Sequence, residues 1–396
     1  MERAAPIGML PRLALRRRAR RPAPFPLGCP GVSLWYNARV AIWQGVRRLG
    51  LGAGDHVLVP AFGCGSEIDA LLGAEVSVDC YRLLPDLRPD LGDVARRLGP
   101  RTRALYVTHY FGFAQPLDSI LAFARERGLL VIEDAAHALY STDELGRPLG
   151  SRCEMSVFSF GKTIPVPDGG ALVLAGGRAR PLRGEAPDAL TVAGTVQSLV
   201  EHALLARFPR GTRALQQRVS EPLVRWTKAM IGRASPAAPA DPATAYRQKN
   251  SLDPARTGWR MSGAAELLLH ALLDATIPAR RWRNYEFLRQ RIEVNGRLRP
   301  LFGALPEGCC PLVFPVRVEA AEELERVLAA HGVSTKRFWP YSHPAVRVEE
   351  FRFEGDLRRS VVGLPVHQGL GEADMERMAE VVGWWSRQPL QSVRPS

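Results

Sequence analysis

Between residues 32 and 177 the sequence alternates short β-branched or apolar runs with amphipathic helical segments. Such alternation predicts an α/β fold with a mostly parallel central sheet covered by helices on both faces. The expected strands are 56–60, 76–79, 104–108, 129–134, 155–160 and 171–174, and the expected helices are 38–49, 66–72, 91–98 and 117–127.

Residues 178–256 interrupt this alternation as an insertion. Residues 191–208 predict an amphipathic helix, Ser220 is expected to cap a second helix, and the Ala/Pro-rich residues 234–245 predict a linker. Two interpretations remain open. The insertion is either a helical cover on the main domain, or a hairpin whose basic residues bring 191–231 to a membrane surface or a partner.

The C-terminal part has the pattern of a small α+β domain. Before it, helices are expected at 260–279 and 279–298; within it we expect strands at 312–318 and 360–364 and helices at 320–331 and 372–386. The predicted organisation is a basic tail (1–31), a large domain (32–298) that contains the insertion (178–256), and a small domain (299–396).

Composition argues against several classes of protein. No apolar run reaches the roughly 20 residues of a membrane-spanning helix, and the arginines near the N-terminus precede no secretory signal. The net charge of +13 comes from scattered arginines without a nucleic-acid-binding motif, so we expect no nucleic-acid partner. The six cysteines lack zinc-site spacing. We therefore expect reduced thiols, no metal and a cytoplasmic protein, peripheral to a membrane only if the insertion contacts one.

Lysine is rare in this chain. Of 53 basic residues only four are lysine, at positions 162, 228, 249 and 336. Since arginine serves wherever a plain positive charge suffices, a lysine in a Gly/Pro-rich loop points to amine chemistry. A deprotonated lysine condenses with an aldehyde, whereas arginine remains protonated. Lys162 is therefore a candidate for covalent attachment of an aldehyde cofactor.

The groups that pyridoxal phosphate requires follow one another along the chain. This cofactor needs a lysine for its aldehyde, a carboxylate beside its pyridine nitrogen and donors for its phosphate. Asp134 ends a predicted buried strand, Ser159 lies near the end of the next strand, and Lys162 follows in a loop. Ligands bind beyond the carboxyl ends of strands in such sheets, so we expect these residues, with His109 and His137, in one crevice.

The same stretches resemble the DegT-type aminotransferases, fold-type-I pyridoxal-phosphate enzymes that mostly aminate keto sugars attached to nucleotides. The resemblance covers roughly residues 32–177 and 257–385, above all the Glu-Asp-Ala-Ala-His run at 133–137 and the downstream Ser-Phe and Lys. It implies that Lys162 holds the cofactor and shuttles a proton, Asp134 pairs with the ring nitrogen, His137 lies near the ring and Ser159 binds phosphate. It also implies a homodimer with active sites at the interface.

Further cofactor contacts follow from the resemblance. Asn37, Ala38 and Arg39, at the start of an expected helix, match the family's phosphate-binding turn, where Arg39 would supply charge. A helix start also suits an anion on physical grounds. Cys64 stands where the family often carries an aromatic residue that stacks on the cofactor.

We predict an aminotransferase that moves an amino group from a donor such as glutamate to a keto acceptor, a nucleotide-linked keto sugar, in polysaccharide or secondary-metabolite biosynthesis. Relatives that act as dehydratases carry histidine at the lysine position, so Lys162 favours transamination. Two alternatives remain open. One is another fold-type-I reaction with the same cofactor, such as dehydration; the other is a non-catalytic, membrane-associated relative.

Overall fold

Two β-sheets organise the chain. The computed structural model describes residues 6–11, 23–176, 184–207 and 241–389. The larger sheet has seven strands in the order β1-β7-β6-β5-β4-β2-β3. Neighbouring strands from β3 to β6 are parallel, whereas β7 and β1 form an antiparallel edge. These strands are β1 (Val32–Trp35), β2 (His56–Pro60), β3 (Ser77–Tyr81), β4 (Thr102–Thr108), β5 (Leu130–Asp134), β6 (Met155–Ser159) and β7 (Gly170–Leu174).

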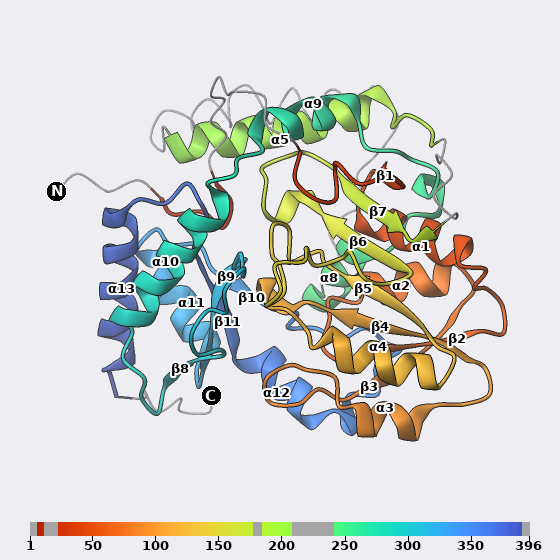
Figure 1. The fold of residues 1–396 in the computed structure, drawn as a ribbon. Helices are drawn as coiled ribbons and strands as arrows, with labels where there is room; N and C mark the ends of the chain where they lie inside the picture. The colour runs from red at the N-terminus through yellow and green to blue at the C-terminus, as the bar shows by residue number, and fades with distance from the viewer. Residues whose placement is uncertain (1–5, 12–22, 177–183, 208–240, 390–396) are drawn as a thin grey trace.

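Helices cover both faces of this sheet, as predicted (Figure 1). Side chains alternate between the faces: Val57 and Val59 of β2 join the core under α1 and α2, whereas Leu58 joins the opposite core. All six predicted strands are present, and β1 adds one that was not predicted. The first helices are α1 (Ala38–Arg48), α2 (Ser66–Gly73), α3 (Leu91–Arg97) and α4 (Leu117–Glu126), with the 3-10 turns η1 (Tyr110–Gly112) and η2 (Phe160–Lys162).

The insertion contains two described helices. The predicted helix at 191–208 is confirmed as α5 (Ala189–Arg207), and the second helix, expected from Ser220, lies outside the described residues. The linker prediction at 234–245 is wrong over its last residues, because α8 (Pro242–Asn250) begins there. Asp241 starts this helix by accepting hydrogen bonds from the amides of Ala243 and Thr244, and Pro242 suits its first position.

The predicted helices at 260–279 and 279–298 are also corrected. They are α9 (Gly263–Leu272) and α10 (Ile277–Arg291), preceded by the 3-10 turn η5 (Pro254–Arg256). A turn at Asp274 separates the two helices. The Asp274 carboxylate accepts a hydrogen bond from the amide of Thr276 in this turn, and a proline lies in the first turn of α10. In Figure 1, α5 and α9 lie together along one side of the large sheet.

A smaller antiparallel sheet completes the fold, in the order β10-β11-β9-β8. Its core is continuous with one side of the large sheet, and Ile7, near the N-terminus, is buried beside Val333. Helix α12 and strand β10 were not predicted. No helix among the described residues has the length and hydropathy needed to cross a membrane. The elements are β8 (Leu298–Pro300), β9 (Val313–Val318), α11 (Ala321–Ala330), β10 (Lys336–Arg337), η6 (Val348–Glu350), α12 (Arg352–Ser360), β11 (Val361–Pro365) and α13 (Glu372–Ser386).

Candidate active site

Asp134 and Ser159 project from the same face of the large sheet, at its carboxyl edge. Each is the last residue of its strand, β5 or β6, and these strands are parallel neighbours. Ile132 and Val157, two residues earlier, are buried in the core under α1 and α2. Because side chains alternate along a strand, Asp134 and Ser159 face the same side. Both are only partly buried although their strands are buried, as expected at the floor of a cleft.

The start of helix α1 lies on that face, against the first residue of β7. Asn37 caps the helix, its side-chain oxygen accepting a hydrogen bond from the Val40 amide at 3.0 Å. Gly170 pairs with Ser159, and a β-carbon at Gly170 would come within 2.5 Å of the Ala38 nitrogen. Glycine is therefore required for this approach. It places the free amides and positive end of the helix beside the Ser159 strand end, a suitable place for an anion.

Lys162 ends the 3-10 turn that follows β6. Among the described residues its amine has no hydrogen-bond or ion-pair partner. Its charge acts on His137, Cys64 and Lys336, which places its side chain in their neighbourhood. An amine without a structural partner at a strand end is available for chemistry.

The loop after Lys162 is fixed by a buried arginine. Arg281 of α10, only 1% exposed, and Gln368 both donate hydrogen bonds to the carbonyl of Thr163, at 3.4 and 3.0 Å. Arg281 also donates to Gln368 and to two backbone carbonyls ahead of β9. The chain next to Lys162 is thus bonded directly to the smaller-sheet part of the molecule.

The carboxylate of Asp134 is oriented by two donors. The Tyr106 hydroxyl donates to Oδ2 at 2.9 Å, and the Ala136 amide donates to Oδ1 at 2.8 Å. Burial, and then the Asp134 charge, hold the pKa of Tyr106 well above its usual value, so the phenol remains a donor. Tyr106 was not predicted from the sequence. The available signal was the parallel pairing of its strand with β5, which brings Tyr106 to the same face as Asp134.

His109 is not in the cleft, contrary to expectation. It and Glu133 are both 0% exposed, and their side chains form a hydrogen bond of 2.8 Å. Burial acts to raise the pKa of Glu133, but the hydrogen bond and charge of His109 outweigh it and lower the pKa. The other ring nitrogen of His109 accepts from the Gln115 amide. The His109–Glu133 pair therefore stabilises the backbone next to Asp134 and does not contact a ligand.

His137 is a neutral imidazole beside two aromatic rings, which also contact each other at a centroid distance of 6.5 Å. Phe111 and Trp339 lie nearly parallel to it, at centroid distances of 5.8 and 5.6 Å. Burial, with the charges of Lys162 and Lys336, holds its pKa well below the usual value. Nδ1 accepts a hydrogen bond from the Phe111 amide at 3.3 Å, so Nε2 carries the hydrogen and can donate.

Two further predicted contacts, Cys64 and Arg39, are partly engaged elsewhere. The Cys64 sulfur lies 2.7 Å from the Ser66 hydroxyl and donates to Glu67 at 3.2 Å. Burial, and next the charge of Glu67, raise the pKa of Cys64 to about 11, so it remains a thiol. The Arg39 guanidinium donates to the Lys249 carbonyl at the end of α8, at 3.2 Å.

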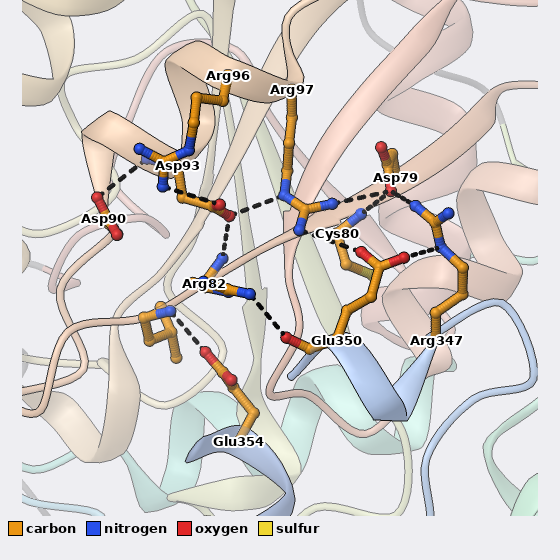
Figure 2. A network of polar contacts seen from close by, with 11 residues as sticks. Asp79, Cys80, Arg82, Asp90, Asp93, Arg96, Arg97, Arg347, Glu350 and Glu354 are labelled. Atoms are coloured by element: carbon orange, nitrogen blue, oxygen red, sulfur yellow. Dashed lines mark hydrogen bonds and ion pairs between the residues drawn. The ribbon is translucent and has the colours of Figure 1, made fainter. Parts of the chain in front are cut away.

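Ion pairs hold η6 against the edge of the large sheet, and Glu354 of α12 accepts a hydrogen bond from the Leu83 amide beside them (Figure 2). Arg97 of α3 lies 3.3 Å from Glu350 and 3.8 Å from Asp79. Arg347 bridges the same two carboxylates, at 2.9 Å from Glu350 and 3.5 Å from Asp79. Since these carboxylates are partly exposed, the ion pairs contribute little to the free energy of unfolding. They serve mainly to position η6 against β3 and α3.

A second buried arginine, Arg358 of α12, joins the walls of the cleft. It donates to the carbonyls of Ala61 and Gly63, after β2, and to that of Trp339, after β10. It forms no ion pair with a carboxylate in the described part of the chain. The loop that carries Cys64 and the loop that carries Trp339 are therefore held at a fixed spacing.

Comparison with known proteins identifies similar sequences over the first part of the chain. Residues 35–180 match the DegT/DnrJ/EryC1/StrS aminotransferase family. An L-glutamine:scyllo-inosose aminotransferase of Streptomyces griseus is 36% identical over 31% of this chain and 30% of its own length. A dTDP-3-amino-3,4,6-trideoxy-alpha-D-glucose transaminase of Streptomyces venezuelae is 34% identical over 34% of this chain and 36% of its own. The aligned segments thus span about a third of these relatives.

Solved structures share the fold over most of the chain. DesV of Streptomyces venezuelae aligns over 90% of this chain and 85% of its own, with a TM-score of 0.63 and 19% identity. The sugar aminotransferase Spr1654 of Streptococcus pneumoniae, described as putative and solved in a PLP form, aligns over 90% and 86%, with a TM-score of 0.62 and 15% identity. At these identities the likeness establishes the fold, an α/β architecture with a smaller second sheet.

Proposed function

We propose that this chain, a member of the DegT/DnrJ/EryC1/StrS aminotransferase family through residues 35–180, is a pyridoxal-phosphate-dependent aminotransferase. One observation carries the proposal. Asp134, Ser159 and the start of α1 share one face of the sheet at its carboxyl edge, and the partnerless amine of Lys162 follows the same strand end. A carboxylate, an anion site and a lysine are the groups this cofactor requires.

The residues present fit the cofactor. Each oxygen of Asp134 accepts one hydrogen bond and retains a lone pair for the hydrogen of a pyridinium nitrogen. The Ser159 hydroxyl, without a hydrogen-bond partner among the described residues, and the amides at the start of α1 suit the phosphate, because Gly170 lets the start of this helix approach the Ser159 strand end. When bound, pyridoxal phosphate supplies an aldehyde carbon and a ring that takes up negative charge from the substrate carbon.

The protein's own groups then have distinct roles in this proposal. The Nζ atom of Lys162 holds the cofactor and, once released, takes the proton from the substrate carbon that carries nitrogen. The Nε2 hydrogen of His137 is available to the ring hydroxyl oxygen, and the low pKa keeps this imidazole neutral. Tyr106 keeps the Asp134 carboxylate in one orientation.

The proposed substrates are an amino acid donor such as glutamate and a keto sugar linked to a nucleotide. The names of similar proteins support this class of substrates. Two of them are a transaminase and an aminotransferase of dTDP-linked sugars, and a third is an L-glutamine:scyllo-inosose aminotransferase. We also propose a homodimer, as the family resemblance implies.

The visible spectrum of the purified protein tests the proposal, for wild type against Lys162→Ala. Wild type should bind pyridoxal phosphate with a visible absorption band, lose that band when glutamate is added, and retain the cofactor on Lys162 after borohydride reduction. Lys162→Ala should show no reducible attachment. Arg283→Ala, an exposed change on α10, serves as the control. A wild type without the band, or an alanine variant that still attaches cofactor, contradicts the assignment. A band that glutamate leaves unchanged favours a different reaction.

A further inference from the structure

Lys336 belongs to the smaller sheet, on the side of the molecule that meets His137. It is in β10, opposite Gly363 of β11. Its Nζ atom lies 5.2 Å from the centroid of the Phe338 ring, and that ring packs edge-on against His137 at 5.9 Å. The side chain is solvent-accessible although protein surrounds it on most sides. Lys336 therefore faces the same space as His137 and Lys162.

In the part of the chain that the structure describes, no carboxylate forms an ion pair with this group of lysines. Lys336 interacts electrostatically with Lys162 and Lys249, and the described residues form no ion pair or hydrogen bond with the amine of any of the three. These are three of the four lysines in the chain. The next residue, Arg337, provides a contrast, since it pairs with Glu322 at 3.1 Å and Glu325 at 3.2 Å.

Gathering unpaired positive charges costs free energy, because each charge disfavours the others. Burial first, and then the charge of Lys162, lower the pKa of Lys336 to about 8, which reflects this cost. Cys64 offsets the cost only in part, since it acts to raise the pKa of Lys336. Uncompensated charge of one sign in a cleft is typical of a site for a ligand of the opposite sign.

We propose that Lys336 binds an oxyanion of the substrate, a carboxylate or a phosphate, in the cleft beside Lys162. The identification of that ligand as a substrate rests on the proposed function. Lys336 belongs to β10 of the smaller sheet, whereas Lys162 follows β6 of the large sheet, so an anion held by Lys336 lies beside the amine that the proposed function assigns to the cofactor. The phenyl ring beneath the Lys336 ammonium holds the charge in place without neutralising it.

The test is calorimetric titration of the cofactor-loaded protein with two probes. Inorganic pyrophosphate represents the phosphate of a nucleotide-linked acceptor, and glutarate represents the carboxylates of an amino acid donor. The variants are Lys336→Met, Lys336→Arg and the matched control Arg337→Met on the same strand. We expect at least one probe to bind Lys336→Met about tenfold or more weakly than wild type. Lys336→Arg should restore most of that affinity, and Arg337→Met should match wild type.

The outcomes separate the two proposals. Weakening of pyrophosphate alone identifies the phosphate as the ligand, and weakening of glutarate alone identifies the carboxylate. The assignment of Lys336 is overturned if neither probe binds wild type, if both bind Lys336→Met unchanged, or if Arg337→Met loses as much. Cofactor content is read separately from the visible spectrum. A colourless protein contradicts the proposed function, whereas a coloured protein with unchanged anion affinity contradicts only the role of Lys336.

Discussion

Tyr106 donates a hydrogen bond of 2.9 Å to Oδ2 of Asp134 from the neighbouring strand of the sheet. The tyrosine is 0% exposed, and its hydroxyl has an acceptor that carries negative charge. Hydrogen bonds to charged groups are stronger than neutral ones. The orientation of the carboxylate is therefore fixed before any ligand arrives.

Replacement of Tyr106 by phenylalanine should loosen this carboxylate. We expect the dissociation constant of pyridoxal phosphate to rise about tenfold, since a buried hydrogen bond to a charged acceptor is worth about 1.5–3 kcal/mol. The measurement is fluorescence titration with the cofactor. Tyr81→Phe is a matched control, because the buried Tyr81 hydroxyl donates to the Tyr106 carbonyl at 2.8 Å. Equal weakening in both variants would show that Tyr106 acts only through general stability.

Replacement of Gly170 by alanine should displace the start of α1. The new β-carbon would meet the Ala38 nitrogen at 2.5 Å, and the resulting strain should lower the free energy of unfolding by about 1–3 kcal/mol. Affinity for pyridoxal phosphate should fall about tenfold, while affinity for pyridoxal, which lacks the phosphate, changes little. Titration with both compounds and urea unfolding measure this. Gly52→Ala, with nothing within 4 Å of the new carbon, is the control. Equal losses for both compounds would place the phosphate elsewhere.

Binding of an oxyanion at Lys336 should depend on pH. The pKa of Lys336 is lowered to about 8 by burial first and by Lys162 and Lys249, while Cys64 acts weakly in the opposite direction. The ammonium is charged below that pH, so affinity should be full there and decline as pH rises through about 8. Pyrophosphate titration about one unit below and one unit above this value measures the change. The ionisation of pyrophosphate also changes over this range, so Lys336→Arg, whose guanidinium stays charged, is the reference. Wild type should lose affinity relative to this variant as the pH rises, and a constant ratio of the two affinities would contradict the prediction.

Periodic segments of the fold could be predicted from the sequence. Strand β2 and helix α13 were predicted with the observed ends, because their apolar residues repeat with the period of a strand or a helix. Helix α12 was not found this way, since its sequence is dominated by charged residues, of which Glu354 and Arg358 are buried. Helix α8 was missed because its capping aspartate and proline follow an Ala/Pro-rich stretch that resembles a linker.

The site could be predicted only in part, for a similar reason. Asp134, Ser159 and Lys162 follow recognisable strands, so their position at one edge could be inferred. Tyr106 could not, because its role depends on the register of β4 and β5, which no local pattern specifies. Lys336 was noted as one of four lysines but not placed beside Lys162, since its proximity to Lys162 arises from the packing of the two sheets and not from a local pattern.

The scarcity of lysine also gives this protein an unusual chemical simplicity. A reagent that acylates amines meets only four side chains in the whole chain, besides the N-terminus, and three of them belong to one group of neighbours. Peptide mass spectrometry can follow the modification of each one separately. Differential acylation thus reports on the occupancy of this one region of the molecule with almost no background from the rest of the surface.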